Sequence, residues 1–397
     1  MEQLSARINS LSPSATIAMN QKGRELKDKG VDVINLSVGE PDFMTPDHIK
    51  EAAKKAIDGP WHHYAPVAGY PDLLKAIVEK FKKENNLDYK ASNIMVSVGA
   101  KHSLANVMLC MIDKGDEVII PAPYWVSYAE QVKLAEGVNV VLDTTVEDEF
   151  KISAQQLEDA ITPKTRALLL CSPSNPTGSV YTKEELAALA AVIAKHPGIF
   201  VIADEIYEHI NFVGGHESIA QFDEIKDQCV IINGVSKGYA MTGWRIGYMA
   251  GPEWLIKACG KLQGQMTSGA CSIAMRASLE ALTGDQSCVT EMRDAFLRRR
   301  DLILGHVNSI EGVKCATPGG AFYVFPDLST YIGKSVDGRK IETDMDLCIY
   351  LLEVGHIATV PGSAFGADGC VRISYANSDE NLEKAMQRLK DALAALS

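Results

Sequence analysis

A regular alternation of short β-branched runs with stretches of helical periodicity, starting near Ile94, constrains the fold more than any other feature of the chain. The runs are apolar at successive positions, which is typical of strands covered on both faces. They lie too far apart for hairpins, so crossover helices are expected between them, and these favour a mostly parallel sheet over a meander. Seven strands are expected, over residues 94–98, 117–120, 138–141, 167–171, 199–203, 229–233 and 246–250. The sequence therefore predicts an α/β fold with a mostly parallel seven-stranded sheet.

The alternation of buried strands and helices ends at about residue 286, and the different pattern that follows predicts a second domain. A long charged helix is followed there by short strands, another helix and a final helix from about Asp379. With 397 residues the chain is long enough for two domains. We expect a large domain over residues 46–290 and a smaller α+β domain formed by residues 1–45 with 291–397. The triplet Arg298, Arg299 and Arg300 in the long helix is interpreted as a solvated face.

Charge and composition exclude several classes of partner. The chain has 39 Lys and Arg against 51 Asp and Glu, a formal net charge of −12, which would repel nucleic acid. No secretory signal is visible, and the apolar runs stop short of the ~20 residues that a membrane helix needs. The nine cysteines are scattered singly and the nine histidines lack metal-ligand spacing. We therefore expect a cytoplasmic protein with no membrane, nucleic-acid or metal site.

The stretch S-K-G-Y-A-M-T-G-W-R-I-G-Y, from Ser236 to Tyr248, places two cations beside predicted buried strands. Its glycines do not fit the dinucleotide fingerprint or the phosphate-binding loop of nucleotide hydrolases. A lysine such as Lys237 can form a Schiff base with an aldehyde, while Ser236 and Arg245 can hold a phosphate. This combination indicates pyridoxal phosphate as the cofactor.

Two further segments supply the other groups that such a cofactor needs. Asp204, in A-D-E-I-Y, follows a predicted strand and could pair with the ring nitrogen, and Tyr207 could donate to the ring oxygen. Asn175, in S-P-S-N-P-T-G, follows another strand in a turn fixed by two prolines. Taken alone, Asp204 could equally cap a helix, and the segment around Asn175 could be an ordinary loop. Their combination with Lys237 favours the cofactor.

Together these three segments resemble the class I/II aminotransferases, which are fold-type I pyridoxal phosphate enzymes. The resemblance covers nearly the whole chain, from P-S-A-T at Pro13 to R-I-S-Y-A at Arg372 and S-D-E-N-L near the end. Within this family, the chain most resembles the bacterial aspartate aminotransferases of the Iγ (Ib) subgroup. The shared motifs are P-S-A-T, V-G-E-P-D-F, P-Y-W-V-S-Y and M-T-G-W-R-I-G-Y.

The resemblance implies a role for each residue around the cofactor ring. Lys237 would bind the aldehyde and then move the proton between the amino acid and the cofactor. Asp204 would pair with the ring nitrogen, Asn175 and Tyr207 would bond the ring oxygen, and Trp125 would stack on the ring face. Of these, Lys237, Asp204 and Tyr207 are the expected catalytic residues.

It also implies how the phosphate is held. Ser236 and Arg245 would bind it, together with backbone N–H groups at a helix start formed by Gly99, Ala100 and Lys101. Tyr64, in Y-A-P, would reach the phosphate of a neighbouring subunit. A homodimer with shared active sites is therefore expected.

For the substrate, the resemblance implies contacts at two ends. Arg372 would grip the α-carboxylate from the small domain, so that binding drives domain closure, and Gly39 would add a backbone N–H. Lys101 and Thr16 would recognise the distal carboxylate of aspartate or glutamate. The expected substrate contacts are Gly39, Lys101, Trp125, Asn175, Arg372 and Thr16.

The implied reaction is the ping-pong transfer of the amino group of L-aspartate to 2-oxoglutarate, giving oxaloacetate and L-glutamate. Broader, aromatic or neutral amino acid specificity is an alternative, and so is a C–S lyase of the same fold. A non-enzymatic sensor is disfavoured because the chain has no basic DNA-binding region. Relatives that accept prephenate carry a basic residue where this chain has Ser12, and the sequence assigns no role to Cys271.

Overall fold

The structure, a computed structural model, describes residues 4–397 and is built on a seven-stranded sheet. The strand order is β2-β8-β7-β6-β5-β3-β4, and neighbours pair in parallel except where β8 lies antiparallel between β2 and β7. The strands are β2 (Ile94–Ser97), β3 (Glu117–Pro121), β4 (Val138–Leu142), β5 (Thr165–Cys171), β6 (Phe200–Asp204), β7 (Cys229–Gly234) and β8 (Gly247–Ala250). The predicted α/β fold and all seven predicted strands are confirmed.

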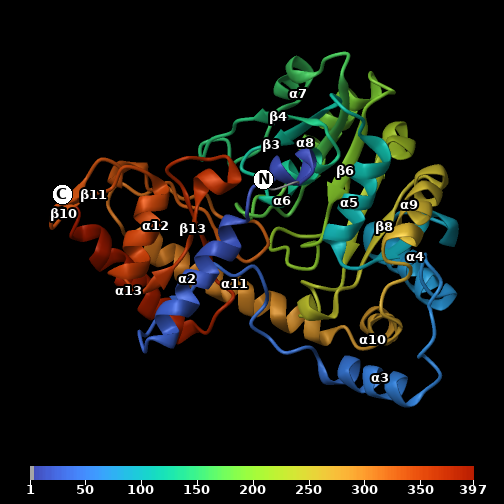
Figure 1. Cartoon of the computed structure of the whole chain (residues 1–397), viewed down its shortest axis with the longest axis horizontal. Coiled ribbons are helices and arrows are strands. Elements are labelled where there is room, and N and C mark those ends of the chain that lie inside the picture. Colours follow the sequence, from blue (N-terminus) through green and yellow to red (C-terminus); the bar gives the residue numbers. More distant parts are fainter. Residues whose placement is uncertain (1–3) are drawn as a thin grey trace.

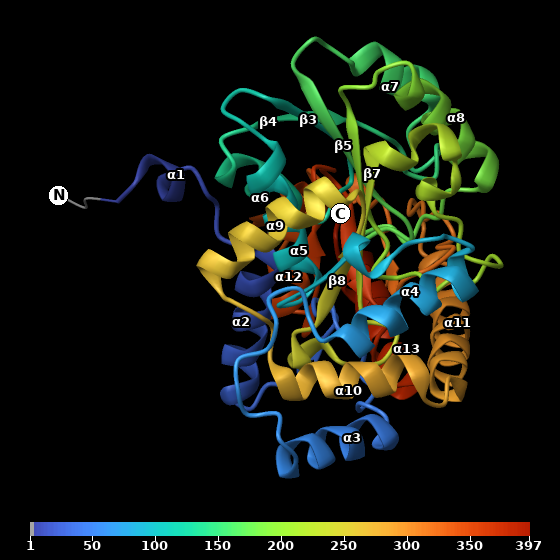
Figure 2. The same ribbon diagram turned by 90° about the vertical axis from the view of Figure 1, so that its right-hand side faces the viewer.

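Helices cover both faces of this sheet because its central strands are apolar at every position. In β6, Val201 and Ala203 face one hydrophobic core, while Phe200 and Ile202 face the other. The first core is closed by α3 (Asp47–Asp58), α4 (Pro71–Asn85), α7 (Ala154–Ala160), α8 (Lys183–Ala194) and α10 (Ser272–Thr283). The second is closed by α5 (Ala100–Met111), α6 (Ser127–Leu134) and α9 (Glu253–Met266). Figure 2 shows α3 and α10 packed side by side.

A separate core joins the two ends of the chain. Met19, Ile34 and Leu36 pack there with Phe322 and Leu389. Figure 1 shows α2 on the same side of the molecule as α12 and α13, and α2 contacts the strands β12 and β13. The elements around this core are α2 (Ala15–Asp28), α12 (Asp344–Glu353), α13 (Asp379–Ala394), the parallel pair β1 (Ile34–Asn35) and β12 (Ile357–Ala358), and the antiparallel sheet of β13 (Val360–Pro361), β14 (Val371–Ser374) and β9 (Tyr323–Val324).

The remaining elements are short or connecting. The hairpin of β10 (Ser335–Val336) and β11 (Arg339–Lys340) lies beside the C-terminus, and α1 (Ala6–Asn9) precedes α2. The 3₁₀ helices are η1 (Ala91–Asn93), η2 (Ile219–Gln221), η3 (Asp223–Gln228), η4 (Thr242–Trp244), η5 (Ser329–Tyr331) and η6 (Gly362–Phe365). Among residues 4–397, no helix is both long and apolar enough to cross a membrane.

The long helix α11 (Ser287–Val307) corrects one expectation, because its arginine triplet is not a solvated face. Arg298 is exposed, but Arg299 is buried and its guanidinium donates to both carboxylate oxygens of Asp42, at 2.8 and 3.0 Å, and to Asp379 at 3.2 Å. Successive helix residues point about 100° apart, so three neighbours cannot share one face. Arg299 therefore joins α11 to the N-terminal segment and to α13.

Candidate active site

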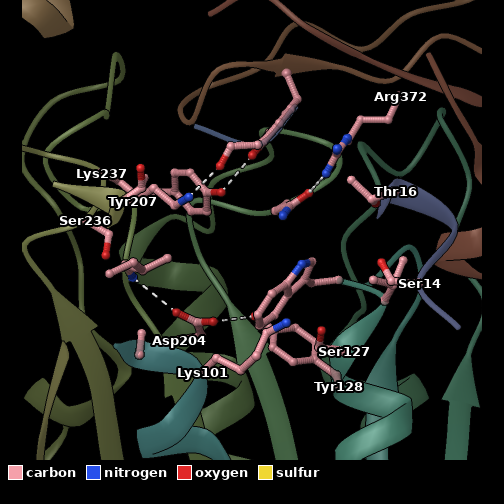
Figure 3. A pocket seen from close by; sticks show the side chains of 18 of the residues that line it. Ser14, Thr16, Lys101, Ser127, Tyr128, Asp204, Tyr207, Ser236, Lys237 and Arg372 are labelled. Carbon is pink, nitrogen blue, oxygen red and sulfur yellow. Dashed lines mark hydrogen bonds between the residues drawn. The ribbon is translucent and has the colours of Figure 1, made fainter. Parts of the chain in front are cut away.

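A cavity of about 310 Å³ lies between the sheet and the core that joins the chain ends (Figure 3). Its floor is formed where β5, β6 and β7 end, the position at which open α/β sheets bind ligands. All the predicted site residues line it except Gly99 and Tyr64. The predicted residues in the wall are Thr16, Gly39, Ala100, Lys101, Trp125, Asn175, Asp204, Tyr207, Ser236, Lys237, Arg245 and Arg372.

Lys237 lies in the turn that follows β7, and it is half-buried. The Nζ atom donates to the carbonyl oxygen of Gly39 at 2.6 Å and lies 5.7 Å from the centre of the Tyr207 ring. Burial lowers the pKa of Lys237 to about 8. A lysine with this pKa has an appreciable neutral fraction near physiological pH, so it can act as a nucleophile and as a base.

Asp204 ends β6 and is buried. One carboxylate oxygen accepts a 2.6 Å hydrogen bond from the hydroxyl of Tyr128, and the other accepts from the backbone N–H of Ile206 at 3.2 Å. Burial raises the pKa of Asp204 to about 6 despite these hydrogen bonds. A cation in the cavity would stabilise its charged form, so the position suits a protonated ring nitrogen.

An anion cradle lies at the start of α5. Gly99 has φ +81°, and a Cβ atom there would collide with the guanidinium group of Arg245. A Cβ at Gly247 would collide with the backbone nitrogen of Ala100. The glycines therefore allow Arg245 and the first N–H groups of the helix to converge beside Ser236. Helix N-termini and guanidinium groups are the groups that bind phosphate in proteins.

Arg372, in β14, is a fully buried cation. Its Nη1 donates to the side-chain oxygen of Asn175 at 2.9 Å and its Nη2 to the carbonyl oxygen of Ser37 at 2.7 Å. Its Nε atom has no hydrogen-bond partner, and no carboxylate within residues 4–397 pairs with its charge. Because an unpaired buried charge is costly, the site suits an anionic ligand group.

A second cationic end of the cavity is formed by Lys101. Its Nζ lies 4.6 Å from the centre of the Trp125 ring and remains open to the cavity. Partial burial, followed by the charge of Arg245, lowers the pKa of Lys101. Thr16 and Ser14 line the same wall, and the Thr16 hydroxyl is buried without a partner in the described structure. Such an orphaned hydroxyl suits an oxygen-bearing ligand.

Tyr64 is not brought into this cavity. Its side chain is 97% exposed and lies in an outer hollow with His62, His63 and Cys271. Within one chain it contacts none of the predicted phosphate ligands.

Sequence reasoning missed two tyrosines that the fold brings to the site. The hydroxyl of Tyr128 reaches Asp204, and that of Tyr323 lies 2.8 Å from that of Tyr207. Tyr128 stands in the P-Y-W-V-S-Y motif, but the motif does not show which partner its hydroxyl meets. Tyr323 lies in an apolar run that indicates only a core strand.

The carboxyl ends of this mostly parallel sheet thus bring together groups suited to an aldehyde, a protonated ring and a phosphate, which is the arrangement of a fold-type I transferase. Residues 31–389 match the family model described as aminotransferase class I and II. The chain therefore belongs to the class I and II aminotransferase family, and the resemblance found in the sequence is confirmed.

Individual relatives are similar over their whole length. A probable aspartate/prephenate aminotransferase from Rhizobium leguminosarum bv. phaseoli is 49% identical over 98% of both chains. The crystal structure of the aspartate aminotransferase from Rhizobium meliloti has a TM-score of 0.96 at 44% identity, covering 100% of both chains. The aspartate aminotransferase from Thermus thermophilus with maleate has a TM-score of 0.93 at 43% identity, covering 99% of this chain and 100% of its own.

Proposed function

We propose that the protein transfers the amino group of L-aspartate to 2-oxoglutarate, using pyridoxal 5′-phosphate. The observation that carries the choice of substrate is that the cavity has cations at two ends, Arg372 and Lys101, with the unpartnered hydroxyl of Thr16 beside the second. A dicarboxylate would satisfy both cations. The names of the relatives, and the maleate bound by the Thermus thermophilus protein, support this proposal.

The residues of the cavity fit the proposed cofactor. The cradle formed by Gly99, Ser236 and Arg245 would take the phosphate, and Lys237 would take the aldehyde. Asp204 would hold the ring nitrogen in its protonated form, and Trp125 would cover the ring. When bound, the cofactor supplies an aldehyde that carries the amino group and a ring that withdraws electrons from the substrate Cα.

The side chains of this chain then perform the proton transfers. Arg372 orients the α-carboxylate with a planar guanidinium, and Lys101 fixes the other end of the substrate. Lys237 would hold the cofactor aldehyde, and its Nζ would act as the base and then as the acid for the proton of the substrate Cα. Its pKa of about 8 suits both steps, because the base and its conjugate acid are both accessible near neutral pH.

The substrate assignment predicts a selective defect in Lys101→Ala. We expect kcat/KM for aspartate to fall roughly 10- to 100-fold, because a charge-assisted hydrogen bond is lost, while the value for alanine changes little. Steady-state kinetics with both amino acids measure this, and Lys114→Ala, an exposed lysine just beyond the other end of α5, is the control.

A spectral titration tests the reaction class. Aspartate added without keto acid should change the visible absorbance of the cofactor-loaded protein, and 2-oxoglutarate should reverse the change. Turnover that needs no keto acid would indicate a C–S lyase instead. Equal losses for aspartate and alanine in Lys101→Ala would contradict the dicarboxylate assignment.

We further propose a homodimer in which Tyr64 serves the neighbouring subunit. The exposure of Tyr64 supports this, as does a nearby open apolar hollow lined by Phe43, Met44 and Trp244, of which Met44 is 80% exposed. Exposed apolar patches mark interaction surfaces. All nine cysteines are free, which supports a reducing, cytoplasmic location.

Prephenate appears in the names of several relatives. In this chain Ser12 is exposed and uncharged, and its backbone N–H donates to the Glu130 carboxylate at 2.8 Å. Relatives that accept prephenate carry a basic residue at the position of Ser12, and this chain has a serine hydrogen-bonded to an acidic side chain there. We therefore propose aspartate rather than prephenate as the first substrate to test.

A further inference from the structure

Tyr323 contacts both Tyr207 and Arg372, two cavity residues that lie in different sequence motifs. It lies on β9, is fully buried and lines the cavity wall. Its hydroxyl lies 2.8 Å from that of Tyr207, and its ring lies 4.6 Å from the guanidinium carbon of Arg372. Tyr207 and Arg372 come from different parts of the fold and both face the cavity (Figure 3).

Either hydroxyl could be the donor in the hydrogen bond between the two tyrosines, and the two directions leave different protons free. Each hydroxyl has one proton to donate. No other acceptor for the Tyr323 hydroxyl lies within hydrogen-bond distance among residues 4–397. If Tyr323 donates to Tyr207, the proton of Tyr207 is free to point into the cavity. If the direction is reversed, Tyr207 cannot donate to a ligand, and the free proton is instead that of Tyr323, which also lines the cavity.

The relative acidity of the two hydroxyls favours the first direction. The guanidinium carbon of Arg372 lies 4.6 Å from the centre of the Tyr323 ring, and its charge opposes the rise that burial causes in the pKa of both tyrosines. Burial raises the pKa of Tyr207 more than that of Tyr323, so the Tyr323 hydroxyl is the more acidic of the two. Arg372 and Tyr323 are also fixed together, because β14 and β9 are paired with Ser374 opposite Tyr323. The position of Arg372 is thereby coupled to the position of the tyrosine hydroxyl.

Gly39 supplies a separate constraint on the same hydroxyl. A Cβ atom at position 39 would lie 2.9 Å from the Tyr323 oxygen, closer than such contacts allow. Gly39 also accepts the hydrogen bond from Lys237. The hydroxyl is therefore confined between a backbone segment, Tyr207 and the sheet that carries Arg372.

We propose that Tyr323 is a positioning residue that donates to Tyr207 and so orients the Tyr207 hydroxyl as a donor to the ring oxygen of the cofactor. This inference rests on the proposed cofactor. Donation by Tyr323 polarises the Tyr207 hydroxyl and strengthens the hydrogen bond that Tyr207 would donate to the ring oxygen. The stronger hydrogen bond stabilises negative charge on that oxygen. That charge is greatest when the lysine–cofactor linkage loses its proton, so Tyr323 lowers the pH at which this proton leaves.

The test is Tyr323→Phe, which removes the hydroxyl and keeps the ring beneath Arg372. In the cofactor-loaded protein, we expect the midpoint pH of the visible absorbance change to rise by roughly 0.2 to 0.6 unit. KM for aspartate should stay within about twofold, because the cation–π contact with Arg372 remains.

Two comparisons separate positioning from a general structural effect. Tyr375→Phe removes another fully buried hydroxyl of the same core, one that donates to the carbonyl oxygen of Ala321 at 3.1 Å, and should leave the midpoint unchanged. In a Tyr207→Phe background, Tyr323→Phe should add no further shift, because its effect passes through Tyr207. Thermal unfolding of the cofactor-free variants checks that each one folds.

The outcomes are distinct. An unshifted midpoint in Tyr323→Phe overturns the inference, and so does a shift of the same size in Tyr375→Phe or a full shift in the Tyr207→Phe background. If the unaltered protein gains no visible band with pyridoxal phosphate, the proposed function itself fails. A shift in Tyr323→Phe alone that disappears without the Tyr207 hydroxyl supports the inference.

Discussion

At the scale of single residues, the site contains charged groups whose removal from water lowers the stability of the folded protein. Asp204 is buried and Lys237 is half-buried, and desolvation shifts their pKa values toward the neutral forms, to about 6 and about 8. Arg372 has no counter-ion within residues 4–397. Such a site is stabilised only when ligands of opposite charge bind, so it selects for them.

Because desolvation of the Asp204 carboxylate lowers stability, replacing Asp204 with a neutral residue is expected to stabilise the cofactor-free protein. The pKa of Asp204 is raised from 3.8 to about 6, so folding is favoured by its protonation below pH 3.8, and that contribution is lost as pH rises through about 6. The cofactor-free Asp204→Asn variant should therefore be more stable than the unaltered protein by about 2 to 3 kcal/mol at pH 8. The Tyr128 hydroxyl can rotate to accept from the new amide.

Urea unfolding at pH 4 and pH 8 measures this difference, which should nearly vanish at the lower pH. Asp143→Asn, an exposed carboxylate directly after β4, is the matched control and should change stability by less than about 0.5 kcal/mol at either pH. A gain in Asp204→Asn that is equal at both pH values would show that charge burial is not its cause.

Residues at strand ends were the most predictable part of the site. Lys237, Asp204 and Asn175 each follow an apolar run, and the carboxyl ends of parallel strands meet at one edge of a sheet. Tyr128 and Tyr323 could not be assigned, because their partners are distant in sequence and only the folded chain brings them together. The role of Tyr64 stays a prediction, since its proposed partner lies on another copy of the chain.

At the scale of elements, a buried ion pair fixes α4 against the segment that follows β6. Lys80 pairs with Glu208, the neighbour of Tyr207, and both side chains are almost fully enclosed. Asn85 and Asn233 donate to the Glu208 carboxylate at 2.9 and 2.8 Å. Two clusters of glutamate and histidine side chains meet at Glu208 and have the proximity of metal ligands, but its oxygens already hold these donors. The pair therefore serves to place the segment carrying Asp204 and Tyr207.

Breaking this pair should be strongly destabilising. Burial opposes the charge of Glu208, but the attraction of Lys80 outweighs it and holds the Glu208 pKa below its usual range. Lys80→Met should lower the free energy of unfolding by about 3 to 5 kcal/mol, because Glu208 is left buried and unpaired. Chemical denaturation measures it.

The exposed Lys82→Met on the same helix is the control, with an expected change below about 0.5 kcal/mol. Adding Glu208→Gln to Lys80→Met should recover part of the loss by removing the unpaired charge. A loss below about 1 kcal/mol in Lys80→Met would mean that the pair contributes little.

The sequence predicts the helices and strands correctly where hydrophobic periodicity determines them. It does not predict which side chains are buried by contacts between distant segments. All seven strands of the sheet agree with their apolar runs. Arg299 does not follow the solvated-face interpretation, because its partners Asp42 and Asp379 lie in segments distant in sequence.

At the scale of the whole molecule, the cavity is shared between two cores. Lys237 and Asp204 belong to the sheet, while Arg372 and Tyr323 belong to the core that joins the chain ends. We propose that residues 46–290 form one domain and residues 1–45 with 291–397 the other. Closure of the second on a bound dicarboxylate would then exclude water from the reacting atoms.

The proposed dimer predicts complementation between two defective variants. Tyr64→Ala and Lys237→Ala should each lose most activity, but a hybrid dimer would contain one site with both residues intact. Dissociating and reassembling an equal mixture should restore activity up to about a quarter of that of the unaltered protein, since half of the dimers are hybrids with one intact site each.

Each variant taken alone through the same procedure is the control. An absence of recovery in the mixture, with hybrid dimers present by mass spectrometry, would show that Tyr64 does not serve the neighbouring subunit.

The division of the cavity also matters for engineering. The cradle for the phosphate combines main chain at the start of α5 with the side chains of Ser236 and Arg245, whereas Ser14 and Thr16 line the cavity from a short N-terminal segment. A designer could therefore exchange residues 13–17 as a cassette to accept new amino acids, while the machinery that performs the chemistry stays untouched on the rigid sheet.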